Sequence, residues 1–375
     1  MNASSASPES PPGAKPTRRL GLDILRGIAV FLMIEQHLGV WLWDSHGRSL
    51  AEYPVLVVFN ALGGGAAPLF IVLAGIGSGL MILKEPKEGV SISVDRTLVV
   101  RGLTILAFGY LLSFATPSWF SVRSWFVLHL IGFGMAITPL LRRIPTWLLL
   151  TSAAMLLLST GPVQALLDTP QAMRNPYMSA RGAYIPSFAG LRIAVAEGQF
   201  PILPWLTPYI LGLVCGRWIH QGRVRNLTVL ALALLVSGAI AGAIWQLGTF
   251  ETGTAAWRNV RIHVPFFPAS PALVCLILGP VILAVRAIIA VETRTTIRAD
   301  HPLVCLGRAS LTLLLVHVVL FRELTRPLGL WRALDMGTAM AVLCGFVMLS
   351  LVLSRRWQRG GYRFGAEWVL RKVAG

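Results

Sequence analysis

The chain has 375 residues, of which 55% are hydrophobic and 13% are charged, and its mean hydropathy is +0.68. These values exclude a water-soluble globular domain and indicate a protein that crosses a membrane several times. The formal net charge of +17 is spread over short segments beside apolar stretches, so we expect the lipid bilayer, and not nucleic acid, to be the partner of these basic residues.

About ten apolar stretches have the length of roughly 20 residues that a helix needs to cross the hydrocarbon core. They predict an all-α, polytopic membrane protein with about ten transmembrane helices. The predicted spans are residues 20–43, 56–83, 97–115, 119–140, 146–166, 199–218, 227–247, 270–290, 302–321 and 334–354.

Lys and Arg concentrate in the cytoplasmic loops of membrane proteins, and here most of them fall on the alternate loops that share a side with the N-terminus. We therefore expect the N- and C-termini to be cytoplasmic. Residues 1–17 are rich in Ser and Pro and predict a disordered cytoplasmic tail. Residues 18–354 form the predicted helical domain, and residues 355–375 a basic cytoplasmic C-terminal tail.

The first predicted span carries Asp23, Arg26, Glu35 and His37 at positions where lipid disfavours ionisable groups. Each such group costs roughly 2.5 to 3.5 kcal/mol at the bilayer centre, so the span predicts a functional site. Arg26 and His37 lie about 20° apart around an ideal helix and about 16 Å apart along it, so they share a face at different depths.

Two interpretations of this span remain open. In the first, Asp23 pairs with Arg26, the pair forms part of a ligand site, and Glu35, which points away from Arg26, meets a partner from another helix. In the second, Asp23 and Arg26 form a buried pair that only fixes helix packing, and His37 is an interior histidine.

Later spans add further candidates. Arg101 and Arg308 lie in the inner parts of their spans, where guanidinium groups either bind phosphate or extend to the lipid headgroups. His317 follows Arg308 by nine residues, on roughly the opposite face, and is a secondary candidate. His129, near the middle of its span, is a core hydrogen-bonding group, a channel-lining group or a proton relay.

Two longer segments lie between the predicted spans, and four cysteines lie within or at the edge of spans. Residues 167–198 and 248–269 are rich in Arg and aromatic side chains, which suits either acceptor recognition or an ordinary interfacial belt. The cysteines have no metal-ligand spacing and no close pair, so we expect neither a metal site nor a disulfide. They are Cys215, Cys275, Cys305 and Cys344.

The segment LDILRG, followed by ten residues and His37, resembles the Arg-x10-His motif of the transmembrane acyltransferase superfamily (acyltransferase-3). Other segments are similar to its heparan-α-glucosaminide N-acetyltransferase-like branch, in its bacterial members. They are AAPLFIVLAGIGSGL, VDRTLVVRG, WFVLHLIGFGMAITPLL, FPILPWLTPYILGLVCGRW, HPLVCLGRASLTLLLVHVVLF and YRFGAEWVLRK.

This resemblance implies an acyl-CoA-dependent acyltransferase, with acetyl-CoA as the expected donor substrate and a glycan or small-molecule amine or hydroxyl as acceptor. It also implies a bacterial cytoplasmic membrane. His37 would act as general base or transient acyl carrier, and Arg26 would help to hold CoA. In the lysosomal relative the catalytic histidine lies in the loop after the first span, where this chain has His46, so His37 and His46 both remain candidates.

Acyl transfer needs a base or nucleophile, which histidine supplies, and a nearby carboxylate such as Glu35 or Asp44 can orient the imidazole. A proton-coupled multi-pass transporter is the alternative, because intramembrane Asp, Glu, His and Arg also build proton relays. Dependence on added acyl-CoA separates the two functions.

Overall fold

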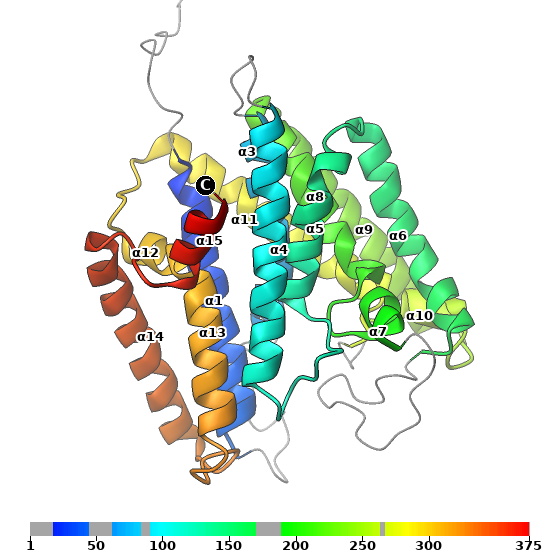
Figure 1. Ribbon diagram of the computed structural model, residues 1–375. Coiled ribbons are helices and arrows are strands. Elements are labelled where there is room, and N and C mark those ends of the chain that lie inside the picture. The colour runs from blue at the N-terminus through cyan, green and yellow to red at the C-terminus, as the bar shows by residue number, and fades with distance from the viewer. Residues whose placement is uncertain (1–17, 45–61, 84–90, 170–188, 263–266, 375) are drawn as a thin grey trace, which may run out of the picture.

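The computed structural model describes residues 18–44, 62–83, 91–169, 189–262 and 267–374. Within these ranges the regular elements are helices, apart from one isolated bridge between Trp43 and Leu334 (Figure 1). The longer helices are α1 (Leu20–Leu42), α3 (Ala66–Leu83), α4 (Ser91–Ala115), α5 (Val127–Leu141), α6 (Thr146–Leu166), α8 (Ile202–His220), α9 (Arg225–Leu247), α11 (Pro271–Arg294) and α14 (Met336–Arg359).

Shorter helices connect these elements and complete the bundle. A π-helical turn follows α7, and a second continues α13. The shorter elements are α7 (Ala189–Arg192) with the turn Ile193–Glu197, α10 (Ala255–Val260), α12 (Pro302–Arg308), α13 (Ser310–Val318) with the turn Val319–Leu324, and α15 (Ala366–Ala374).

Eight helices in the described ranges are long and apolar enough to cross a membrane. The segments Pro302–Arg308 and Ser310–Leu324 make a ninth if they are counted as one span, bent by 72°. The protein is therefore a multi-pass integral membrane protein with an all-helical fold, and the prediction of about ten spans was too high by this measure.

The predicted span that is not among these long helices is 119–140. Its helix, α5, has only 15 residues and is about 22 Å long, which is shorter than the hydrocarbon core. The preceding residues form a turn in which Ser121 N donates to Ser124 Oγ at 2.9 Å and Ser124 N donates to Ser121 O at 2.9 Å. These local bonds compete with helix formation, so the apolar stretch does not become one continuous helix.

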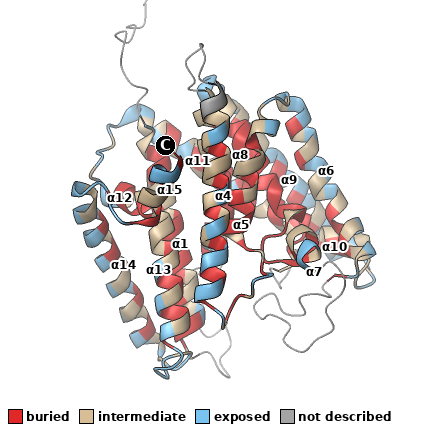
Figure 2. Ribbon diagram, viewed as in Figure 1, coloured by how far each residue is buried: buried red, intermediate tan, exposed pale blue. Residues whose placement is uncertain are grey.

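Buried residues are most frequent on α8 and are also frequent on α3 and α1, whereas few residues of the peripheral helix α14 are buried (Figure 2). Helices α3 and α8 approach closely because Gly75 and Gly79 face Gly212 and Gly216. A Cβ added to Gly75 would lie 3.0 Å from Gly212 Cα. Paired small residues four positions apart allow such close helix contacts in membranes.

We call the two ends of the bundle the Asp23 end, where α1 begins, and the Trp41 end, where α1 finishes. The C-terminal helix α15 lies toward the Asp23 end (Figure 1). Thr97, in the first turns of α4, donates to the carbonyl of Ala374 at 3.3 Å. Both ends of the described chain therefore lie on the same side of the bundle.

Most of the segment predicted as a basic C-terminal tail is structured. Helix α14 extends to Arg359, and α15 packs against α4 and α13. The Glu367 carboxylate accepts hydrogen bonds from Leu311 N at 2.6 Å and Thr312 N at 3.0 Å, which caps the start of α13. The predicted tail at residues 1–17 lies outside the described residues.

Candidate active site

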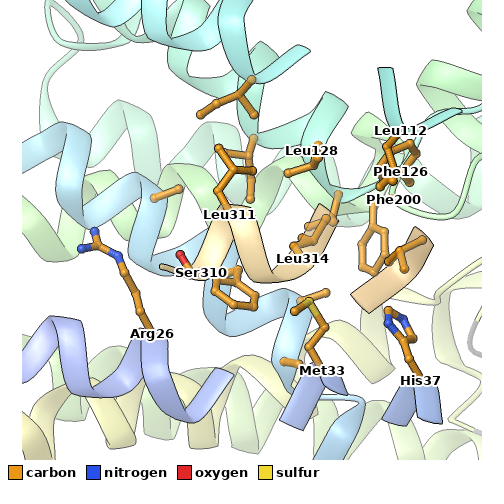
Figure 3. Close-up of a pocket in the computed structure, with 18 of the residues that line it drawn as sticks. Arg26, Met33, His37, Leu112, Phe126, Leu128, Phe200, Ser310, Leu311 and Leu314 are labelled. Carbon is orange, nitrogen blue, oxygen red and sulfur yellow. The ribbon is translucent and has the colours of Figure 1, made fainter. Parts of the chain in front are cut away.

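A cavity of about 1820 Å³ lies inside the bundle and reaches from the Asp23 end to the Trp41 end. Its lining includes Arg18, just before α1, and Trp41, in the last turn of α1. Arg26 and His37 also line it and are labelled in Figure 3. This volume exceeds the roughly 300 to 1,000 Å³ of pockets for drug-sized ligands. The cavity therefore has room for one large ligand or for two ligands at once.

Asp23 is the centre of an ion-pair network at one end of this cavity. Its carboxylate oxygens lie 2.7 Å from Arg18 Nε, 2.8 Å from Arg26 Nη1 and 3.2 Å from Arg308 Nε. The predicted pair of Asp23 and Arg26 is present, and Arg308 joins it from α12. Because Asp23 is fully buried while the three arginines line the cavity, the carboxylate holds their guanidinium groups in place.

The Asp23 end of the cavity carries a surplus of positive charge. Arg101 and Arg371 also line it there, in addition to the three arginines around Asp23. The guanidinium of Arg101 contacts Met81 Sδ at 3.5 Å, and no ion pair involves it within the described ranges. Several guanidinium groups near the buried carboxylate of Asp23 form a site suited to a ligand with more than one phosphate.

His37 and His317 form a hydrogen-bonded pair further along the cavity. His37 Nδ1 lies 2.8 Å from His317 Nε2, and His317 Nδ1 lies 2.8 Å from the carbonyl of Leu313. A carbonyl only accepts, so His317 Nδ1 must donate, and neutral His317 then accepts at Nε2 from His37 Nδ1. This chain of bonds leaves Nε2 of His37 as the basic nitrogen, on a side chain that lines the cavity.

Aromatic rings fix the orientation of this imidazole. The His37 ring stacks on Trp41 with centroids 4.6 Å apart and meets Trp119 edge-on at 5.4 Å. It is also nearly parallel to the His317 ring, with an interplanar angle of 11°. With one nitrogen bonded and its faces packed, His37 has little rotational freedom, which is what a base or nucleophile requires.

Between the arginines and the histidines the cavity wall is mainly apolar. Figure 3 shows Met33, Leu311 and Leu314 in the space that separates Arg26 from His37. Ser310 and Ser78 supply polar groups along this passage. The structure thus joins a polycationic end to a histidine pair through a passage of low polarity.

The bend between α12 and α13 explains why Arg308 and His317 serve different ends of this cavity. The chain turns by 72° after Arg308, and α12 lies against α1 close to Asp23. His317, one helix later, contacts His37. The sequence predicted that these two side chains do not act on one atom, and their placement agrees with that expectation.

Glu35 does not line the cavity that contains His37. Its side chain is buried, and its Oε2 atom accepts no hydrogen bond within the described residues. Among the described contacts, His317 is the residue that hydrogen-bonds to the His37 imidazole, and the predicted role of Glu35 stays a prediction. The sequence made His317 only a secondary candidate, because it was compared with Arg308 on the same span. The positions of residues around one helix do not reveal contacts with another helix.

His129 also lies away from the cavity lining. Its Nδ1 accepts from Phe126 N at 3.3 Å at the start of α5, and its ring packs against Tyr110 at 4.5 Å. Among the predicted roles, that of a hydrogen-bonding group in the core is the one its contacts match. His46 lies outside the described residues, so the choice between His37 and His46 stays a prediction.

Two features of the site were missed. Arg18 was not among the candidate site residues, yet it binds Asp23. Arg322 was not a candidate either, yet it is buried at the Trp41 end of the cavity. Of the segments 167–198 and 248–269, in which the sequence suggested acceptor recognition or an interfacial belt, only Phe267 among the described residues lines the cavity. Within the described residues no group of three His, Cys, Asp or Glu side chains is placed to hold a metal ion.

Comparison with protein-family models gives two matches. Residues 216–375 match a family of unknown function, DUF418, and a search of curated proteins finds no match. Residues 18–244, which include α1 with Arg26 and His37, match the catalytic region of heparan-alpha-glucosaminide N-acetyltransferase, a description that implies acetyltransferase activity. Because this match covers more than half of the chain, the protein belongs to the heparan-alpha-glucosaminide N-acetyltransferase catalytic family.

Proposed function

We propose that the protein transfers an acetyl group from acetyl-CoA to an amine or hydroxyl acceptor at His37. The observation that carries this proposal is the continuity of one cavity from the arginines at the Asp23 end to the His37–His317 pair. The phosphates of CoA would lie among Arg26, Arg101 and Arg308, and the pantetheine arm would follow the apolar passage toward the imidazole.

The basic Nε2 of His37 removes the proton from the acceptor as its nitrogen or oxygen attacks the thioester carbonyl. The carbon–sulfur bond then breaks, and the CoA thiolate takes the proton from the imidazolium. His317 stabilises that imidazolium by accepting from its Nδ1–H. If the acetyl group passes first to His37 itself, the same nitrogen is the nucleophile, and the kinetics follow a ping-pong pattern.

The distribution of basic residues predicts that the Asp23 end faces the cytoplasm, which is where acetyl-CoA is available. The acceptor would then reach His37 from the opposite end. A transfer of this kind delivers the acetyl group across the membrane without moving CoA through it.

The proton-coupled transporter is less well supported by the structure. Transporter sites are typically built from two interrupted helices in corresponding halves of the chain. The described ranges contain one such bent pair, α12 with α13. A large cavity lined by several arginines at one end is instead what a phosphate-rich donor requires.

The test uses purified protein in proteoliposomes with radiolabelled acetyl-CoA and a panel of amino sugars and alcohols. We expect labelled product or labelled acetate from the wild type, and a loss of roughly 100-fold or more in His37→Ala, as for removal of a general base. His220→Ala is the matched control, because His220 is exposed and does not line the cavity. Solute uptake without consumption of acetyl-CoA would overturn the proposal in favour of transport.

A further inference from the structure

Three arginines surround one tryptophan at the Trp41 end of the cavity. The guanidinium carbon of Arg326 lies 4.1 Å from the centroid of the Trp331 ring, that of Arg322 lies 4.2 Å away and that of Arg332 lies 5.8 Å away. All four side chains line the cavity. We call these four residues the Trp331 cluster.

The Trp331 cluster forms no ion pair in the described part of the chain, although the charge of Glu323, next to Arg322 in the sequence, attracts the Arg322 guanidinium. No carboxylate there lies within 4.0 Å of its three guanidinium groups. Arg322 Nη2 donates to the carbonyl of Ser118 at 3.1 Å, and Arg332 Nε donates to the carbonyl of Val40 at 3.3 Å. Among the described residues the cluster therefore keeps a surplus of positive charge, since its three arginines exceed the one neighbouring carboxylate, that of Glu323.

Arg322 makes the case for a ligand, because it is only 7% exposed. Its Nε atom is buried and has no hydrogen-bond partner within the described residues. A buried guanidinium without an ion pair is costly unless something else binds it. Because Arg322 lines the cavity, a ligand that enters there could supply the partner of Nε.

The Trp331 cluster lies close to the reacting imidazole. The guanidinium carbon of Arg322 is 5.9 Å from the Trp41 ring and 5.5 Å from the Trp119 ring, and both of these rings pack against His37. A ligand whose anionic group binds the cluster can thus present another group to His37. The arginines at the Asp23 end are already assigned to the donor.

We propose that Arg322, Arg326 and Arg332 bind an anionic group, a phosphate or a carboxylate, on the acceptor. This inference rests on the proposed acetyl transfer and names the class of acceptor: an amine or alcohol that also carries an anion. The donor then binds through its phosphates at one end of the cavity and the acceptor through its anion at the other, with the nucleophile of the acceptor and the thioester meeting at His37.

The test is a binding measurement that needs no turnover. Glucosamine 6-phosphate and glucosamine are titrated into the purified protein in a neutral detergent at constant ionic strength, and glucuronate and glucose form a second pair. We expect at least one anionic sugar to bind about tenfold or more tightly than its neutral parent, as for one charged hydrogen-bonded contact. The double variant Arg326→Gln/Arg332→Gln should abolish this advantage, and Arg326→Lys/Arg332→Lys should retain most of it.

Two controls locate the effect. Arg123→Gln removes an exposed arginine that follows Trp119 in the chain but does not line the cavity, and it should leave the advantage unchanged. Arg101→Gln should also retain it, since Arg101 lies at the Asp23 end. Equal binding of charged and neutral sugars, or an advantage that survives in the double variant, overturns the inference. Loss of the advantage in the double variant without any acetyl transfer by the wild type would preserve this anion site and remove the proposed enzyme function.

Discussion

His37 Nδ1 lies 2.8 Å from His317 Nε2, although 280 positions separate these residues in the sequence. The carbonyl of Leu313 holds the outer nitrogen of His317, so the pair has a defined direction of hydrogen bonding that ends at Nε2 of His37. This contact joins α1, the first helix of the bundle, to α13, which belongs to the bent span in the C-terminal part of the chain. It makes His317 a positioning residue for His37.

Replacing His317 should therefore slow transfer without weakening donor binding. We expect His317→Ala to lower kcat by roughly 10- to 100-fold, as for loss of an orienting partner, and to leave KM for acetyl-CoA unchanged because the arginines lie at the other end of the cavity. Steady-state kinetics check this, with His220→Ala as control. A rise in KM with unchanged kcat would show that His317 contributes to donor binding instead.

Asp23 should be essential for stability. Asp23→Asn keeps the shape of the side chain but removes the charge that pairs with Arg18, Arg26 and Arg308. Breaking a buried ion pair costs about 3–5 kcal/mol, so the thermal unfolding midpoint in detergent should fall markedly. Glu292→Gln is the matched control, because Glu292 pairs at 3.4 Å with the partly exposed Arg19. Equal midpoints for the two variants would contradict the role given to Asp23.

Arg101 should contribute to donor affinity, and it lies outside the Asp23 network. Arg101→Gln should raise KM for acetyl-CoA by about tenfold or more through the loss of a charged hydrogen bond to phosphate, with a smaller change in kcat. Arg96→Gln is the comparison, since Arg96 is exposed on the same helix and does not line the cavity. The same KM in both variants would place the phosphates elsewhere.

The contact between α1 and α12 depends on the absence of a side chain at Gly307. A Cβ at this position would overlap the carbonyl oxygen of Asp23 and lie 2.8 Å from Gly27 N. Gly307→Ala should therefore destabilise the protein by about 1–3 kcal/mol or more, as for overpacking, and displace the arginine network. Gly345→Ala on α14 meets no atom within 4 Å and should leave the unfolding midpoint unchanged or slightly higher. Equal effects of the two substitutions would argue against this close approach.

The spans were largely predictable because length and hydropathy determine which segments cross a bilayer. The common face of Arg26 and His37 was predictable for a similar reason, since the period of one helix fixes it, and both line the cavity. Residues 119–140 form a shorter helix than predicted, because their apolar composition hides the side-chain and backbone bonds around Ser121 and Ser124 that turn the chain.

Contacts between helices were the part that the sequence did not reveal. The chain bends after Arg308, but position 309 is alanine, so no proline in the sequence signals the bend. Because of the bend, Arg308 contacts Asp23 while His317 contacts His37. The Trp331 cluster depends on the same tertiary arrangement, because a count of basic residues cannot separate a buried Arg322 from an arginine in a loop. Glu35 was assigned to the site because it is near His37 in sequence, but it does not line the cavity.

The central claim, that one cavity brings the thioester of acetyl-CoA to His37, is tested most directly by an experimental structure with a non-hydrolysable acetyl-CoA analogue bound. The account predicts the phosphates among Arg26, Arg101 and Arg308, with the carbonyl carbon of the analogue about 3–3.5 Å from the reacting atom held at His37, or from Nε2 itself. An analogue whose acyl end lies outside the cavity, or whose phosphates bind away from these arginines, would contradict it.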